Sequence, residues 1–251
     1  MKSVVRSYRR VGRALRRALD TLDGSGATEP WNSPRPVLLL AGAFSPARAL
    51  SVLERRLRRD GHGVWTLRCG VDARGRGMED VAEQVRDAVE YLYAPGAAGP
   101  LDLIGHAEGG LVGHYYVKRL GGDTRVRTLV TLGTPHHGSP TAFALAPFHR
   151  RARQLLPMSA FLRRLHIGAF PRGVRFVSLY SKADRVSPFP CCVLEADGIG
   201  NLLNLELGGV GHQELLHRKA VYEVLRRELA LGHGERLARP RLRALPGLGR
   251  A

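Results

Sequence analysis

Apolar residues in the middle of the chain form short continuous runs, which alternate with stretches where apolar residues recur at helical spacing. Continuous aliphatic runs are typical of strands buried on both faces, whereas helical spacing indicates an amphipathic helix. The runs predict strands at residues 37–40, 64–67, 101–104, 126–132, 176–180 and 202–207, and the helical spacing predicts helices at 47–59, 78–92, 111–120 and 214–231. Such alternation predicts an α/β fold, with a mostly parallel sheet and helices on both faces.

The two ends of the chain differ from this body in charge. Residues 1–19 carry seven Lys or Arg and no acid, and apolar side chains recur there at helical spacing. This pattern predicts a basic amphipathic helix at residues 1–22. The helix either lies on an anionic membrane surface or docks on its own domain with the arginines in water. We expect a linker at 23–35, an α/β domain at 36–231 and a basic, mobile tail at 232–251.

Composition narrows the possible classes of function. The formal net charge is +17, but the ends contribute most of it, and no nucleic-acid recognition motif is present, so we expect no nucleic-acid partner. The three cysteines do not form a disulfide framework, and no Cys or His spacing matches a zinc site. We therefore expect neither a metal nor another cofactor. The sequence has no membrane-spanning stretch and no signal-peptide core, which favours a cytoplasmic location. Peripheral contact with a membrane surface is compatible with this location.

One stretch interrupts the alternation of strands and helices. About 40 residues, from 133 to 173, separate two predicted strands, which is long for a simple connection. Phe143, Phe148 and Phe161 lie among its arginines. The stretch predicts a helical cap over a pocket, or a pair of amphipathic helices packed on the domain. The two interpretations are compatible, because a cap is made of packed helices.

The most informative motif is at residues 101–110, which read Leu-Asp-Leu-Ile-Gly-His-Ala-Glu-Gly-Gly. An apolar strand runs into a tight turn flanked by Gly105 and Gly109, and a helix follows. In α/β serine hydrolases the residue at the tip of this turn is the nucleophilic Ser. Here it is Ala107, whose methyl group cannot attack a substrate. The backbone amide of Glu108, at the start of the helix, is expected to face the pocket and bind an oxyanion.

The other two groups that serine hydrolysis needs are present in the expected chain order, nucleophile, acid and then His. Asp184 follows the strand predicted at 176–180, and His212 stands in a Gly-rich loop after the strand predicted at 202–207. Loops at the carboxyl ends of parallel strands are where catalytic groups of open α/β sheets lie. We interpret the two residues as an acid–His dyad; the alternative is a turn-forming Asp and an unrelated loop His.

Four blocks, in order, resemble the bacterial lipase and esterase branch of the α/β-hydrolase superfamily. They are Gly105-His106-x-x-Gly109-Gly110, residues 130–139 (Val-Thr-Leu-Gly-Thr-Pro-His-His-Gly-Ser), Tyr180-Ser181-x-x-Asp184 and Gly211-His212. The resemblance implies hydrolysis or binding of acyl esters or similar lipid-like small molecules, with Asp184 and His212 as triad members. It also implies an oxyanion hole from Ala43 and Glu108, and substrate contacts from Phe44, His106, Phe143 and Phe161.

Ala107 leaves three interpretations open. The protein is a natural pseudoenzyme that binds an acyl or other apolar ligand, or a Ser→Ala variant made to trap substrate, or the site performs water-mediated chemistry. Removing the nucleophile of a triad costs on the order of a million-fold in rate, so a covalent mechanism is excluded for this chain as written. A non-catalytic role in binding a ligand or partner at a membrane surface is the alternative to ester hydrolysis.

Overall fold

The computed structural model describes residues 36–42, 45, 48–69, 75–93, 99–195 and 201–232. The predicted basic helix and linker at 1–35, and the tail after residue 232, lie outside the described residues. None of the helices within these described ranges is both long enough and apolar enough to span a membrane.

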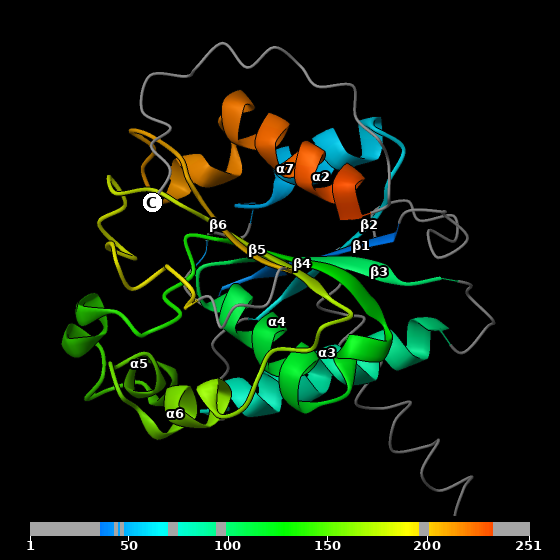
Figure 1. The fold of residues 1–251 in the computed structure, drawn as a ribbon. Coiled ribbons are helices and arrows are strands. Elements are labelled where there is room, and N and C mark those ends of the chain that lie inside the picture. Colours follow the sequence, from blue (N-terminus) through cyan, green and yellow to red (C-terminus); the bar gives the residue numbers. More distant parts are fainter. Residues whose placement is uncertain are drawn as a thin grey trace, which may run out of the picture.

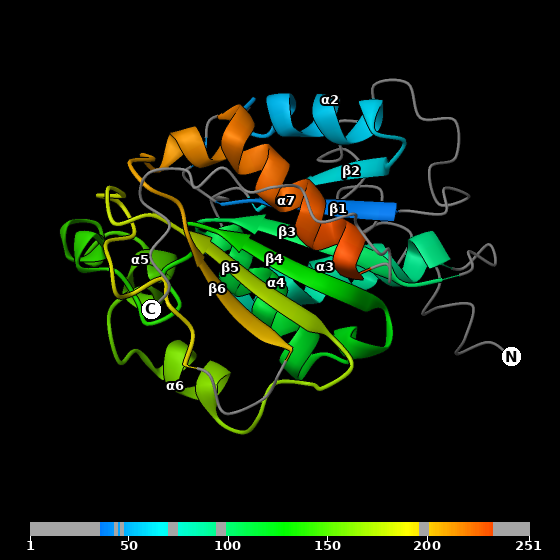
Figure 2. The same cartoon turned by 45° about the horizontal axis from the view of Figure 1, so that its top comes forward.

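A parallel sheet of six strands forms the centre of the molecule (Figure 2). Its order is β2-β1-β3-β4-β5-β6, and every neighbouring pair is parallel. The strands are β1 (Pro36–Ala41), β2 (Gly63–Arg68), β3 (Leu101–His106), β4 (Val126–Leu132), β5 (Arg175–Tyr180) and β6 (Leu202–Glu206). The predicted α/β fold is confirmed, and parallel pairing places the carboxyl ends of all six strands at one edge.

Helices cover both faces of the sheet (Figure 1). Helices α2 (Ser51–Arg59) and α7 (Lys219–Gly232) lie on one face, and α3 (Met78–Tyr93) and α4 (Glu108–Arg119) lie on the other. A hydrophobic core lies on each face of the sheet. Alternate residues of β1 pack into one core and then the other, because successive side chains of a strand point to opposite faces. Leu38 and Leu40 pack in the α3–α4 core, and Leu39 packs in the α2–α7 core.

The final helix begins later than the sequence pattern predicts. A short 3₁₀ turn, η4 (Gln213–Leu216), comes first, and α7 starts only at Lys219. The side chain of Glu214 explains the break, since its carboxylate accepts hydrogen bonds from the Gly211 amide at 2.7 Å and the Arg218 guanidinium at 2.7 Å. These bonds fold the chain into a turn that closes the His212 loop. Helix α2 also begins later than predicted, at Ser51 rather than at residue 47.

The stretch between β4 and β5 folds into short helical pieces. They are η3 (Pro140–Ala144), α5 (Arg150–Gln154) and α6 (Ala160–His166), and a further 3₁₀ turn, η2 (Gly122–Thr124), precedes β4. Helix α6 lies beside α4, and its residues Phe161 and Leu165 are buried in the α3–α4 core. Helix α5 sits near the carboxyl edge of the sheet, so this stretch reaches the place where loops after the strands converge (Figure 1).

Candidate active site

Ala107 occupies the tip of a strained turn between β3 and α4. Its φ of 51° and ψ of −125° are unfavourable for any residue with a Cβ atom. Surrounding hydrogen bonds hold the conformation: the Ala107 amide donates to the Leu132 carbonyl at 3.0 Å, and the Thr134 hydroxyl donates to the Ala107 carbonyl at 2.9 Å. The chain therefore holds Ala107 at the tip of a sharp, strained strand-to-helix turn, and the role of this turn as a nucleophile elbow stays a prediction.

The glycines beside Ala107 are required by close backbone packing. A Cβ atom on Gly105 would lie 2.4 Å from the Gly110 Cα, and one on Gly109 would lie 2.4 Å from the Leu40 carbonyl oxygen. A Cβ on Gly110 would lie 2.0 Å from the Thr134 hydroxyl oxygen. Real Cβ atoms do not approach so closely, so larger side chains at these positions would push α4 away from the sheet. The spacing of glycines in the motif thus follows from how α4 packs over β1, β3 and the loop after β4.

Asp184 and His212 form a buried pair at the carboxyl edge. His212 Nδ1 lies 2.7 Å from Asp184 Oδ2, and the other carboxylate oxygen accepts hydrogen bonds from the Val186 and Ser187 amides at 2.8 and 2.9 Å. Both oxygens are thereby fixed, and Nδ1 donates its proton to Asp184. His212 Nε2 is then the ring nitrogen that is not bonded to the carboxylate.

Two neighbours set the position of this pair. A Cβ atom on Gly133 would lie 2.8 Å from Asp184 Oδ2 and 3.1 Å from His212 Nδ1, so the pair packs directly over a glycine at the end of β4. The ring of His106 lies 4.6 Å from that of His212 between centroids, and its Nε2 donates to the His212 carbonyl at 3.3 Å. Burial, with the nearby His212 as a smaller cause, lowers the pKa of His106 to about 3, so this ring is neutral near pH 7.

A buried ion pair links the elbow to α5. Arg151 Nη1 lies 3.0 Å from Glu108 Oε1, and the two side chains are only 4% and 3% exposed. Arg151 also donates to the backbone carbonyls of Cys69 and Arg76. The sequence pattern did not predict this pair. The signal was the acid Glu108 directly after the tip of the Gly-rich turn, since a buried charge needs an opposite charge nearby.

A cavity of about 270 Å³ brings these parts together. Ala107, Glu108 and His212 line it, and Gly42 stands where a Cβ atom would lie 3.3 Å from the Glu108 amide nitrogen, so glycine leaves space in front of that amide. The remaining lining residues come from loops at the carboxyl edge and from the stretch between β4 and β5: Ser45, Pro135, Ser139, Thr141, Ala142, Leu145, Ala152, Leu155, Val186, Ser187 and Gln213.

The structure brings some of the other predicted site residues to this cavity and not others. Ala43 and Phe44 lie outside the described residues. His106 is buried behind His212 and is not part of the lining. Phe161 is 1% exposed and stacks on Tyr115 in the α3–α4 core, and Phe143 is 62% exposed. The predicted substrate contacts by these three side chains find no support in the cavity, because the helical pieces turn Phe161 inward and Phe143 outward.

The adjacent His136 and His137 point to different partners. His136 Nε2 is 3.0 Å from the Thr131 hydroxyl, and His137 Nε2 donates to the Val193 carbonyl at 2.9 Å. Within the described part of the chain, no group of three or more His, Cys, Asp or Glu side chains is arranged to hold a metal ion.

Comparison with protein families identifies the group to which this site belongs. The profile of the palmitoyl protein thioesterase family matches residues 36–168, more than half of the chain. The chain belongs to this family. The parallel sheet with helices on both faces has the α/β-hydrolase fold that the four sequence blocks predicted. The comparison with curated proteins gives no match.

Solved lipase structures share the fold of this family member at low identity. Lipase B of Aspergillus fumigatus is 17% identical with a TM-score of 0.67, and the match covers 85% of this chain and 57% of the lipase. Bacillus licheniformis lipase BlEst2 is 16% identical with a TM-score of 0.62 and coverages of 82% and 96%. The monoacylglycerol lipase of Paleococcus ferrophilus is 16% identical with a TM-score of 0.58 and coverages of 80% and 94%.

Proposed function

We propose that the cavity beside Ala107 binds acyl esters, thioesters included, and that this chain as written performs little or no hydrolysis because the nucleophile position holds Ala107. The observation that carries the proposal is the Asp184–His212 hydrogen bond of 2.7 Å, in the same cavity as the tip of the strained elbow. Membership of the palmitoyl protein thioesterase family supports an acyl thioester as one substrate class.

The strain at Ala107 supports a site built for acyl transfer. A non-glycine residue with φ of 51° and ψ of −125° costs of order 1–3 kcal/mol, and such strain persists mainly where function requires it. With serine at this position, the hydroxyl would stand at the elbow tip and His212 would take its proton. Asp184 would stabilise the imidazolium, and the Glu108 amide would donate to the oxyanion that forms on the substrate.

The test of this function is to install the missing hydroxyl. We expect Ala107→Ser to create turnover of p-nitrophenyl esters and acyl N-acetylcysteamine thioesters, up to about a million-fold above the parent chain. The measurement is steady-state release of nitrophenol or thiol by both forms. A folded Ala107→Ser protein that binds these esters and leaves them intact would contradict the proposal.

Two matched variants identify the mechanism. In the Ala107→Ser protein, His212→Ala should abolish the new activity, whereas Ala107→Gly should remain as inactive as the parent. Strong turnover by the parent chain that disappears on His212→Ala and does not respond to serine would instead show attack by a water molecule activated by His212.

A non-catalytic role is the second candidate function. A buried acid–His pair without a nucleophile is compatible with a protein that holds an acyl ligand without cleaving it, and the parent chain should then bind an ester without turnover. Peripheral contact with anionic membranes through residues 1–22 stays a prediction, since those residues lie outside the described ranges. Salt-sensitive co-sedimentation with anionic vesicles, lost in a protein that begins near residue 22, is the corresponding test.

A further inference from the structure

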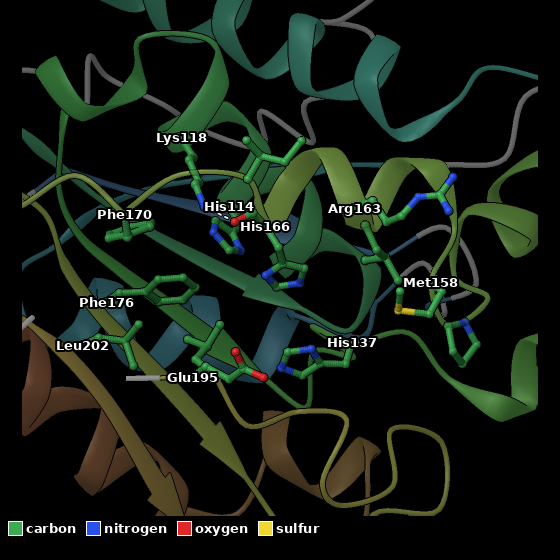
Figure 3. A pocket seen from close by; sticks show the side chains of 14 residues that line it. His114, Lys118, His137, Met158, Arg163, His166, Phe170, Phe176, Glu195 and Leu202 are labelled. Carbon is green, nitrogen blue, oxygen red and sulfur yellow. Dashed lines mark hydrogen bonds between the residues drawn. The ribbon is translucent and has the colours of Figure 1, made fainter. Parts of the chain in front are cut away.

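A second and larger cavity lies away from the acid–His pair, on the face of the sheet that α3 and α4 cover. Its volume is about 620 Å³, within the usual range of small-molecule sites, and residues of α4, α6, β5 and the edge strand β6 are among those that line it (Figure 3). None of its lining residues also lines the cavity beside Ala107.

A wall of tightly packed backbone separates the two cavities. The Ser139 amide donates to the Leu155 carbonyl at 2.8 Å, which joins the loop after β4 to the segment between α5 and α6. Gly138, with φ of 88°, stands where a Cβ atom would lie 2.7 Å from both the Leu155 carbonyl oxygen and the Pro157 nitrogen. Leu155 lines the first cavity and Pro157 lines the second, so the contact forms the boundary between them.

The inner surface of the second cavity is apolar. Phe170, Phe176 and Leu194 are at most 5% exposed, and Leu202 continues the same wall along β6. The rim is mixed, because the apolar side chain of Ile167 is 64% exposed there beside the exposed side chains of Arg163 and Glu195. The surface is thus suited to an alkyl chain that enters along α6 and packs against the phenyl rings.

Charged groups at the edges define the head group of such a ligand. Lys118, from α4, directs its ammonium toward His114, whereas the guanidinium of Arg163 points away from the His114 ring (Figure 3). Glu195 is the acid of this lining. Burial lowers the pKa values of His114 and His166, so both rings are neutral near pH 7. Lys118 and Arg163 against the single acid Glu195 favour a monoanion over a dianion.

A buried polar atom lies beside the same ammonium. His114 is 3% exposed, and its Nδ1 has no hydrogen-bond partner among the described residues. Nearly all buried polar atoms in proteins have a partner, which ordered water or a ligand supplies where the chain does not. Lys118 donates to the His166 carbonyl at 3.3 Å, which holds its ammonium at this end of the cavity.

We propose that this second cavity binds a single-chain alkyl carboxylate, with its head group at Lys118 and His114 and its chain against Phe170, Phe176 and Leu202. The site is separate from the proposed acyl chemistry at Ala107 and does not depend on it.

The test is calorimetric titration of the full chain with octanoate, decanoate, decan-1-ol and decylamine at pH 7.5. Affinity should rise up to about fourfold for each added methylene, as expected for burial of an alkyl chain. Decanoate should bind about tenfold more tightly than decan-1-ol, because the alcohol lacks the charge that Lys118 recognises. Failure of decanoate to bind, or tighter binding of decylamine, would overturn the proposal.

Two charge variants locate the head group. Lys118→Met should weaken decanoate binding about tenfold and leave decan-1-ol binding unchanged, since only the charged head loses its partner. Arg163→Gln, on the same rim but directed away, should change decanoate affinity less than about threefold. Equal effects of the two substitutions would refute the placement at Lys118.

Two bulky substitutions at exposed rims separate the cavities. Ile167→Trp should block decanoate at the second cavity, and Leu145→Trp, which narrows the cavity beside Ala107, should leave this binding intact. The reverse pattern would assign decanoate to the first cavity and refute the second site, whatever the activity of Ala107→Ser. Thermal unfolding of each variant confirms that it folds.

Discussion

The two cavities differ in how their charges are placed. Beside Ala107, the charges of Glu108 and Arg151 are almost fully buried and meet at 3.0 Å, whereas Arg163 and Glu195 stand exposed at the rim of the second cavity. The second cavity has more than twice the volume of the first, 620 against 270 Å³, yet it lacks the acid–His pair. The comparison teaches that the first cavity is lined by desolvated, fixed charges, whereas the second keeps its charges exposed at the rim.

The sharpest test of this difference is removal of one buried charge. Arg151→Met leaves the Glu108 carboxylate buried without its partner, which typically costs 3–5 kcal/mol in the free energy of unfolding, here about 4 kcal/mol. Arg163→Gln, at the rim of the second cavity, should change stability by less than about 0.5 kcal/mol. Urea unfolding of both variants measures the contrast. Similar small losses would mean that Glu108 is solvated or neutral in the folded protein.

Buried neutral histidines make both regions sensitive to acid, to different extents. Burial lowers the pKa of His106 near the first cavity, and those of His114 and His136 on the other side. Because the unfolded chain takes up protons near pH 6.5 and these folded rings do not, stability is complete above that pH and is lost as the pH falls. Each ring should cost about 2 kcal/mol between pH 7 and pH 5.

The measurement is the free energy of unfolding of the parent, His114→Phe and His106→Phe at both pH values. Each single substitution should remove about a third of the decrease in the free energy of unfolding that the three rings cause between pH 7 and pH 5. His114 and His136 together should therefore account for more of this decrease than His106 does. A parent chain that is equally stable at pH 7 and pH 5 would show that the rings protonate in the folded state.

Relief of backbone strain at Ala107 should give the smallest of these changes in the free energy of unfolding. Ala107→Gly replaces a residue that is unfavourable at φ of 51° with one that adopts it freely, and it should raise stability by about 1 kcal/mol after the entropy of glycine is subtracted. Ala183→Gly, at an exposed position with ordinary backbone, should lower stability by about 0.5–1 kcal/mol. A loss of stability in both variants would show that the elbow is not strained.

The sequence predicted the fold well, because six apolar runs and the helical spacing between them are local features. It also placed Asp184 and His212 after the correct strands, since the carboxyl ends of parallel strands share one edge. The start of α7 was wrong because the Glu214 carboxylate accepts a hydrogen bond from the Gly211 amide, three residues earlier, and a short turn replaces the first helical turn. Helical spacing of apolar residues does not show this competition between a side chain and the helical backbone bonds.

Contacts across the fold were beyond prediction for a related reason. The partner of Glu108 stands 43 residues away on α5, and many arginines were equally available in that stretch. Phe161 and Phe143 were both predicted to contact substrate, but α6 packs against α4 and buries Phe161, whereas Phe143 stands exposed on η3. The roles of Asp184, His212 and Ala107 stay predictions until the activity of the serine variant is measured.

The packed backbone at Gly138 couples the shapes of the two cavities. The connection between β4 and β5 supplies residues to both cavities: Ala152 and Leu155 line the first, and Pro157 and Ile167 line the second. An insertion or deletion there should shift both linings in one step, so a change that reshapes one cavity should also reshape the other. In protein engineering, the whole connection between β4 and β5 is best exchanged as one segment, while the parallel sheet is kept unchanged.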